Sequence, residues 1–264
     1  MAKPQPQQQV AKVKPAGEIA VMHDQLPEYL AQMGNKTSRG NEQVGTDDLV
    51  FPRLEVVQAL SPCLKKSDPT YIEGSEQGML FNNLTRELYG DEVLVMPIYF
   101  RKEYLIWVVR QKSDGSGGFR GSYATAELAA AKITELDEDN LQIVDTAQQF
   151  CLLVGNGRTE EIVISMAKSK LKVSRRWNSL IRLAGGDRWS RVYKLGAVEE
   201  VGKKGTFWNY TVEVAGFPTK PMYDIAAAKY DSIASGRVRA DISGDAMMAD
   251  DDGDGTHPKK GNDY

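Results

Sequence analysis

The residues best suited to chemistry are the basic side chains within Ser165–Ala184 (SMAKSKLKVSRRWNSLIRLA). On a helical wheel of about 100° per residue, one side of this segment is cationic and the other is apolar. The cationic side carries Lys168, Lys172, Arg175 and Arg182. The apolar side carries Val173, Trp177, Leu180, Ile181 and Ala184. The spacing predicts a helix docked by Trp177, with a basic face turned outward.

The basic face has no acidic partners at helical spacing, so its charges repel one another. Phosphate groups would relieve this repulsion and release their counterions. The pattern therefore predicts binding of an anionic polymer, with single-stranded DNA as the first candidate. The alternative interpretation is a solvated helix face that binds nothing.

Further cations and aromatic residues surround this helix. The additional basic residues proposed for the site are Arg176, Arg191, Lys203 and Lys204. On the following expected strand, Trp208 and Tyr210 share one face, while Phe207 lies on the other. We expect Trp208 and Tyr210 to face the core and Phe207 to offer a ring for base stacking, which tolerates any base sequence.

The glycine-rich segment Ser113–Ser122 (SDGSGGFRGS) adds two more candidate contacts, Phe119 and Arg120. It lacks the spacing of a phosphate-binding loop or of a dinucleotide-binding loop. We therefore interpret it as a flexible loop whose Phe119 and Arg120 contact the nucleic-acid strand.

The net charge of −3 conceals two oppositely charged regions. Residues 165–220 contain 12 Lys and Arg against 4 Asp and Glu, a net of +8, whereas residues 241–264 contain 7 Asp against 2 Lys, a net of −5. Such charged regions indicate which partners a protein binds rather than which fold it adopts. We expect residues 241–264 either to mimic nucleic acid and compete for the basic site, releasing to contact replication or recombination proteins, or merely to aid solubility.

The sequence argues against an enzyme. No metalloprotease, serine-hydrolase or phosphate-loop motif is present. The two histidines, His23 and His257, lie near the chain ends, which removes the commonest general base from the central region. Cys63 and Cys151 form neither a disulfide framework nor a zinc-ligand pattern. We expect no catalytic residues, no metal and no cofactor.

The elements that must position these residues suggest one central domain. We expect a flexible arm and linker over residues 1–48, a single nucleic-acid-binding domain over 49–240 and a disordered acidic tail over 241–264. Neither a secretory signal nor a membrane-spanning run is evident, which predicts a cytoplasmic protein and no membrane partner. The sequence is compatible with an oligomer.

The expected elements are mainly strands with attached helices. Strands are predicted over residues 92–109, 142–154, 161–164, 191–201 and 206–215, and helices over 125–136, 165–184 and 226–233. Ser165 is the expected helix N-cap, and Gly185 its end. The fold class is therefore α+β, with an OB-like β-barrel and insertions as the first candidate. An open α+β sheet is the alternative.

The chain resembles phage-encoded single-stranded DNA-binding proteins with an OB-like fold and an acidic C-terminal tail. The resemblance rests on SMAKSKLKVSRRWNSLI, on RVYKLGAVEEVGKKGTFWNYTVEVAG and on the Asp-rich tail ending in Tyr264. It implies sequence-independent coating and protection of single-stranded DNA during replication or recombination, and contact of the tail with a polymerase or helicase. A second hypothesis is a structural, adaptor or inhibitor protein that uses its basic face on a protein partner.

Overall fold

The structure is a computed structural model that describes residues 40, 43, 51–108, 118–136, 138–155, 158–202 and 205–234. The chain divides into two units, Met1–Val44 and Gly45–Tyr264, and the fold described here belongs to the second. The predicted acidic tail at 241–264 and the predicted N-terminal arm, apart from Gly40 and Gln43, lie outside the described residues.

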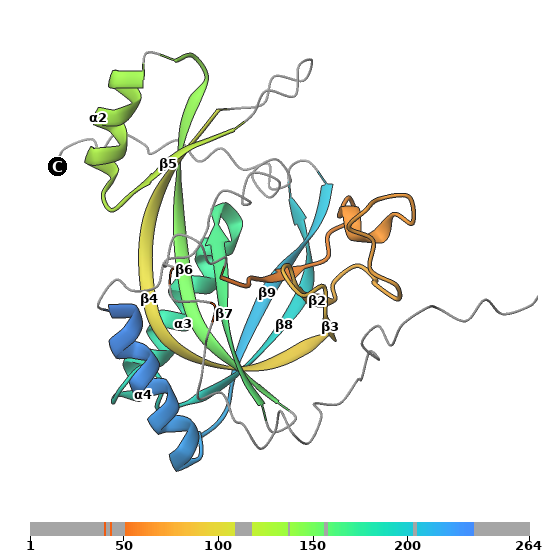
Figure 1. Cartoon of the computed structure of the whole chain (residues 1–264), viewed down its shortest axis with the longest axis vertical. Helices are drawn as coiled ribbons and strands as arrows, with labels where there is room; N and C mark the ends of the chain where they lie inside the picture. The colour runs from red at the N-terminus through yellow and green to blue at the C-terminus, as the bar shows by residue number, and fades with distance from the viewer. Residues whose placement is uncertain are drawn as a thin grey trace, which may run out of the picture. The chain divides into compact units, whose positions relative to one another are not determined.

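The main element is a six-stranded antiparallel sheet that curves strongly along its length (Figure 1). Its order is β7-β6-β4-β8-β9, with β5 paired to β4. The strands are β4 (Glu92–Val108), β5 (Phe119–Tyr123), β6 (Leu141–Gly155), β7 (Arg158–Ala167), β8 (Val192–Gly202) and β9 (Gly205–Gly216). The strands predicted from the sequence are confirmed, and β7 is longer than expected. Val, Ile and aromatic residues favour this pleated surface.

A small three-stranded sheet contacts the large sheet through β1 (Leu54–Val56) and β3 (Leu88–Gly90). It contains β1, β2 (Leu80–Asn82) and β3 in that order, with the 3-10 helix η3 (Pro62–Leu64) between β1 and β2. The Asn82 side chain accepts the backbone N–H groups of Leu84 and Thr85, which holds the turn after β2. Val57, Cys63, Ile72 and Phe81 form the small core beneath it.

The segment around β1 also satisfies the exposed edge of β9. The Gln58 side chain donates to the Trp208 carbonyl and accepts from the Trp208 N–H, both at 2.8 Å. The Tyr210 hydroxyl donates to the Leu54 carbonyl at 2.7 Å. These bonds join β1 to the last strand of the large sheet.

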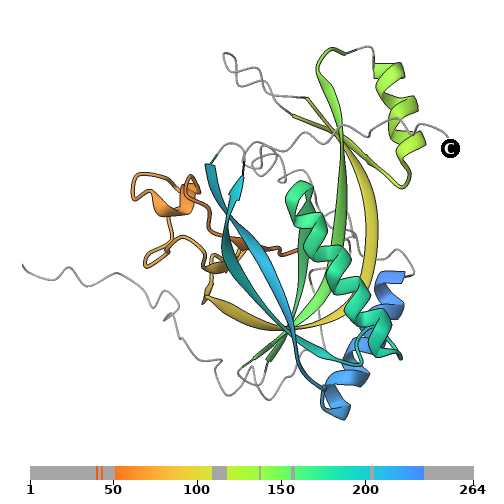
Figure 2. The ribbon, with the colours of Figure 1, turned by 180° about the vertical axis from the view of Figure 1, so that it is seen from behind.

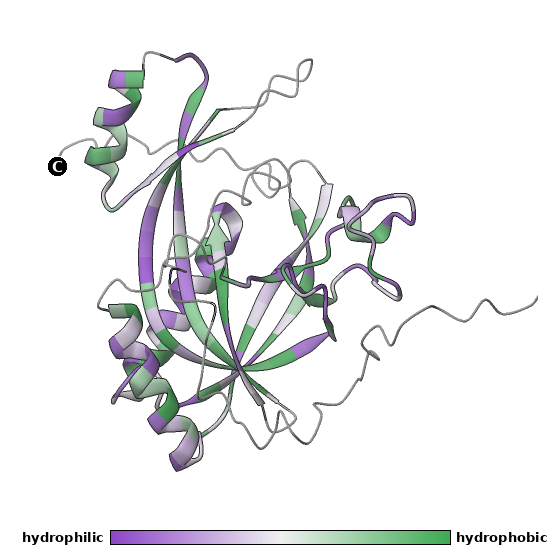
Figure 3. Cartoon of the chain, in the orientation of Figure 1, coloured by the Kyte–Doolittle hydropathy of each residue, from purple (hydrophilic) through white to green (hydrophobic). Residues whose placement is uncertain are grey.

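Three α-helices lie in the described part of the chain. They are α2 (Ala126–Leu136), α3 (Leu171–Ala184) and α4 (Lys220–Ala234). Figures 1 and 2 show α3 and α4 on opposite sides of the sheet, and α2 contacts β4, β5 and β6 near the far end of β4. In Figure 3, α4 carries hydrophilic and hydrophobic patches, as expected for a helix that packs by one face.

Alternating residues of β6 explain why both faces of the sheet are covered. Ala147, Cys151 and Leu153 belong to the core cluster that contains Trp177 of α3. Phe150 and Leu152 belong to the cluster that contains Ala226 and Ile233 of α4. Successive side chains of a strand point to opposite faces, so one strand supports both helices.

The structure is mainly β with attached helices, which confirms the α+β class. Both sheets are open, with β7 and β9 at the two edges of the large sheet. This arrangement matches the alternative of an open sheet, and the OB-like barrel stays a prediction. β1 lies against both edges, through the Arg53–Val163 bridge on the β7 side and the Leu54–Tyr210 bond on the β9 side.

The predicted start of the basic helix at Ser165 is wrong. Ser165 pairs with Gln148, and Ala167 pairs with Thr146, because β7 continues along β6. The 3-10 helix η4 (Lys168–Lys170) follows, with Lys168 at a φ of 50°, and α3 begins only at Leu171. The predicted end is confirmed, since Gly185 follows the helix at a φ of 69°.

Trp177→Ala should lower the free energy of unfolding by about 3–5 kcal/mol, because it leaves a cavity beneath α3. Trp177 is 0% exposed and meets Tyr193 edge-on, with ring centroids 5.8 Å apart. Urea unfolding followed by circular dichroism measures the change. Leu183→Ala is the control, since Leu183 is 85% exposed. Equal losses in the two variants would contradict the role of Trp177.

Gln58→Ala should cost about 2 kcal/mol of stability, because the edge groups of Trp208 lose their partners while staying covered. Gln77→Ala provides the matched control, since Gln77 is exposed. The same urea titration compares the two variants. An unchanged unfolding midpoint for Gln58→Ala would show that water replaces the amide at no cost in stability, which contradicts the prediction.

Candidate nucleic-acid interface

Helix α3 presents basic side chains because its apolar residues fix its orientation. Val173, Trp177 and Ile181 recur at four-residue intervals and are buried against the sheet. Figure 2 shows α3 lying on the sheet. The side of α3 opposite these buried residues therefore faces away from the sheet. The exposed basic residues on α3 are Lys172, Arg175, Arg176 and Arg182.

Only Lys172 of these four has a carboxylate partner in the described part of the chain. Its Nζ lies 2.6 Å from Oε2 of Glu200 on β8, and the Asn209 amide donates to the same oxygen at 3.1 Å. Burial raises the pKa of Glu200, but the hydrogen bonds from Lys172 and Asn209 outweigh it, so the net pKa lies below its ordinary value. Glu200 therefore stays charged and compensates Lys172.

Arg175, Arg176 and Arg182 have no ion pair with any described residue. Three exposed guanidinium groups on one helix are thus without a compensating carboxylate among the described residues. Arginine offers a planar fork of donors that matches phosphate geometry. Helix α3 is therefore a candidate anion-binding surface.

A hydrogen-bonded network lies where α3 meets β6. The Gln149 amide nitrogen donates to Ser174 Oγ at 2.9 Å and to Asn178 Oδ1 at 3.4 Å. Nη2 of Arg188, in the loop after α3, donates to Gln149 Oε1 and, at 2.7 Å, to Asn178 Oδ1. The Arg188 guanidinium also lies over the Phe100 ring, 5.5 Å from its centroid.

The strand β4 continues this surface beyond the network. Phe100, Lys102 and Tyr104 alternate along one face of β4, and both aromatic rings are partly exposed. Lys102 lies 4.9 Å from the centre of the Tyr104 ring and pairs with Asp145 at 3.1 Å. Aromatic and cationic side chains are therefore interleaved beside α3.

The structure brings some of the other predicted residues to α3 and separates others from it. Phe207 is partly buried and pairs across the hairpin with Glu200, the partner of Lys172. Arg191 lies at the opposite end of β8, over the exposed Phe217 ring at 4.8 Å. Lys203 and Lys204 lie outside the described residues.

The expected roles of Trp208 and Tyr210 agree with the structure. Tyr210 is 3% exposed, and Trp208 packs against the core cluster. Their neighbour Asn209 is also buried, because its side chain bonds Glu200 and the Tyr210 N–H.

Phe119 and Arg120 are not in a flexible loop. Both belong to β5, where Phe119 packs on Trp107 with centroids 5.0 Å apart. Both nitrogens of the Arg120 fork contact Glu138 at 2.7 Å. These partners are distant in sequence, so the local pattern did not reveal them. Lys168 lies in η4 rather than on the helix, and it is only partly exposed.

Sequence reasoning missed Phe100 and the network around Arg188. The alternation of Phe100, Lys102 and Tyr104 is visible in the sequence, and it could have marked β4 as a candidate surface. The partners of Arg188 come from β6 and α3, so no local signal could identify them.

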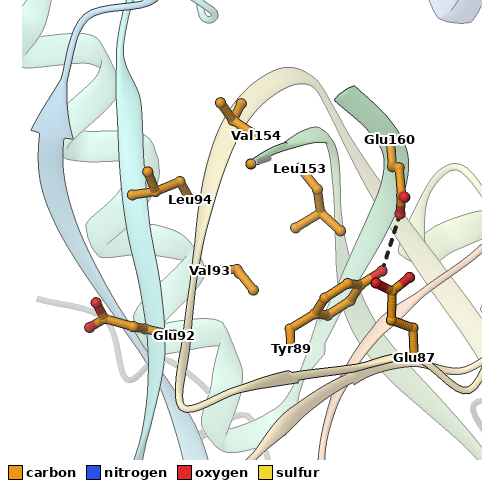
Figure 4. A pocket seen from close by; sticks show the side chains of 9 residues that line it. Glu87, Tyr89, Glu92, Val93, Leu94, Leu153, Val154 and Glu160 are labelled. Carbon is orange, nitrogen blue, oxygen red and sulfur yellow. Dashed lines mark hydrogen bonds between the residues drawn. The ribbon is translucent and has the colours of Figure 1, made fainter. Parts of the chain in front are cut away.

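A pocket of about 570 Å³ lies elsewhere on this unit, between the start of β4 and the end of β6 (Figure 4). Glu87, Glu92 and Glu160 line it together with apolar side chains of β4 and β6. The Tyr89 hydroxyl donates to Glu160 at 3.2 Å, and burial raises the pKa of Tyr89 to about 12. Three carboxylates would repel phosphate, so this pocket is unsuited to nucleic acid.

Two general observations concern the described residues. No helix there is long and apolar enough to cross a membrane. No group of three or more His, Cys, Asp or Glu side chains is arranged to hold a metal ion.

Comparison with models of protein families gives a match. No curated protein and no solved structure matches the chain. The family model described as Pam3 phage gp34-like protein matches residues 20–239, most of the chain. This match supports the bacteriophage origin that the sequence resemblance implies. The chain belongs to the family of Pam3 phage gp34-like proteins.

Proposed function

We propose that this chain is a non-catalytic bacteriophage protein that coats and protects single-stranded DNA during replication or recombination. It binds without sequence preference, by neutralising phosphates and stacking bases. The proposal includes the OB-like interpretation of the curved sheet, because such sheets bind single strands on an open face.

One observation carries the proposal. Arg175, Arg176 and Arg182 are exposed on a single helix, without a carboxylate partner among the described residues. Exposed arginines without carboxylate partners can neutralise phosphates and release the counterions of a polyanion, which favours binding. The buried Trp177 holds the helix in place, so Arg175 and Arg182, which are seven residues apart and share one side of α3, are fixed relative to the sheet.

The aromatic residues near α3 support stacking on bases. Phe100 and Tyr104 on β4 are partly exposed and flank Lys102, while Phe207 lies near the start of α3. Stacking contributes about 1–3 kcal/mol per base in proteins that bind single strands. Arg120 and Arg191 contribute less to the proposed site, since each already has a partner in the structure.

The double variant Arg175→Glu with Arg182→Glu should weaken binding to oligothymidine. Each lost phosphate contact reduces the slope of log K against log salt by about 0.7, so the slope should fall by about 1.4. Fluorescence anisotropy across a salt series measures this slope. Lys65→Glu with Lys66→Glu is the control, because these exposed lysines lie on the small sheet's connection rather than on α3.

Two results would overturn the proposal. One is absence of oligothymidine binding by the unmodified chain at low salt, also after its tail is removed. The other is a nuclease-resistant complex of defined stoichiometry with a host or phage protein that Arg175→Glu disrupts, since this indicates an adaptor.

Neutralising the tail should tighten DNA binding if residues 241–264 compete for the basic site. Changing the seven Asp of this segment to Asn in the full chain removes its excess negative charge. The gain in affinity should be largest at low salt, where attraction between opposite charges is least screened. A truncated chain that ends at residue 240 should behave in the same way. Equal affinity at every salt concentration would favour the solubilising role.

A further inference from the structure

Arg188 differs from the exposed arginines of α3 because it is partly buried and held in place. Its Nη2 donates to the side-chain oxygens of Gln149 and Asn178, and its guanidinium lies over the Phe100 ring. Gln149 is 0% exposed. Three elements, β6, α3 and β4, therefore fix the position of one guanidinium group.

The partners of Arg188 orient it without neutralising it. Amide oxygens carry no net charge, and Arg188 has no ion pair with a described carboxylate. Its Nε is buried without a hydrogen-bond partner, and its Nη1 bonds no described residue. Burying a charge without a counterion is costly, so an anionic group bound beside Arg188 would be favourable.

The network also fixes which atoms face Arg188. The Gln149 nitrogen donates to Ser174 and Asn178, which leaves Gln149 Oε1 for the guanidinium. A structural arginine that only joins α3 to the sheet would gain more from a carboxylate at this position. Gln149 and Asn178 instead leave the positive charge available.

Other charged and aromatic groups surround this position. Arg182 lies one helical turn beyond Asn178, and Lys102 lies two residues beyond Phe100 on the same strand face. Burial lowers the pKa of Arg188, whereas Cys151 and Tyr193 act in the opposite direction. Both of these neighbours belong to the core.

We propose that Arg188 binds a phosphodiester group of the nucleic acid, with Arg182 as the flanking cation, since Lys102 is already paired with Asp145. This assignment rests on the proposed function and names the part of the strand that the site recognises. Because the guanidinium is partly removed from water, its contact with phosphate is screened less by salt than the contacts of exposed arginines.

Arg188→Met tests the assignment in the full chain. Methionine keeps an unbranched apolar chain next to Phe100 but removes the charge. Affinity for oligothymidine should fall about tenfold or more, and the slope of log K against log salt should fall by about 0.7. Arg188→Lys should restore the slope, because it restores the charge, with only part of the affinity. Lys220→Met on α4, at the opposite face of the sheet, is the matched control.

A measurement on the unmodified chain keeps the test independent of how the variants fold. The Nε–H signal of Arg188 in a nitrogen-15 NMR spectrum, assigned by its loss in Arg188→Lys, should shift when short oligothymidine or inorganic pyrophosphate is added. Thymidine, which carries the sugar and base of oligothymidine without phosphate, should leave it unchanged.

The outcomes separate this assignment from the proposed function. Oligothymidine binding in which Arg188→Met behaves like Lys220→Met overturns the assignment and leaves the proposed function standing. An Nε–H signal that neither oligothymidine nor pyrophosphate shifts also overturns it. An unmodified chain that binds no oligothymidine overturns the proposed function and the assignment together.

Discussion

The burial of Trp177 between α3 and the sheet is the contact on which the candidate interface depends. The ring is fully enclosed and meets Tyr193 edge-on. A helix anchored by so large a side chain cannot rotate about its axis without opening the core. The direction of every other side chain on α3 follows from this contact, including the exposed arginines and Asn178, which bonds Arg188.

The sheet can pack a helix on each of its faces because successive side chains of a strand point to opposite faces. On β6, neighbouring residues support α3 on one face and α4 on the other. Gln149 lies within this apolar pattern, on the same face as Ala147 and Cys151. A buried amide there is tolerated because it bonds Ser174, Asn178 and Arg188. The polar network is thus built into the core rather than added to its surface.

Patterns confined to neighbouring residues were predicted well. The strands β4, β6, β8 and β9, the hairpin joining β8 to β9 and the anchoring role of Trp177 all follow from alternation or helical spacing, whereas β5 was predicted to be a loop. Contacts between segments that are distant in the sequence were not predicted. Ser165 is a good helix N-cap locally, but pairing with Gln148 extends the strand through it. The sequence suggests that Arg120 is available for a ligand, but in the structure it is paired with Glu138, which lies 18 residues later.

The amide side chains along β9 have a consequence for assembly. An edge strand normally offers unpaired backbone groups to which another chain can add a strand. The Gln58 side chain, from the segment after β1, hydrogen-bonds both the N–H and the carbonyl of Trp208 on β9. The Asn209 side chain accepts the Tyr210 N–H. A second copy could extend the sheet here only by displacing these amides. Two copies of this chain would therefore meet at this edge through side chains rather than through a continuous sheet.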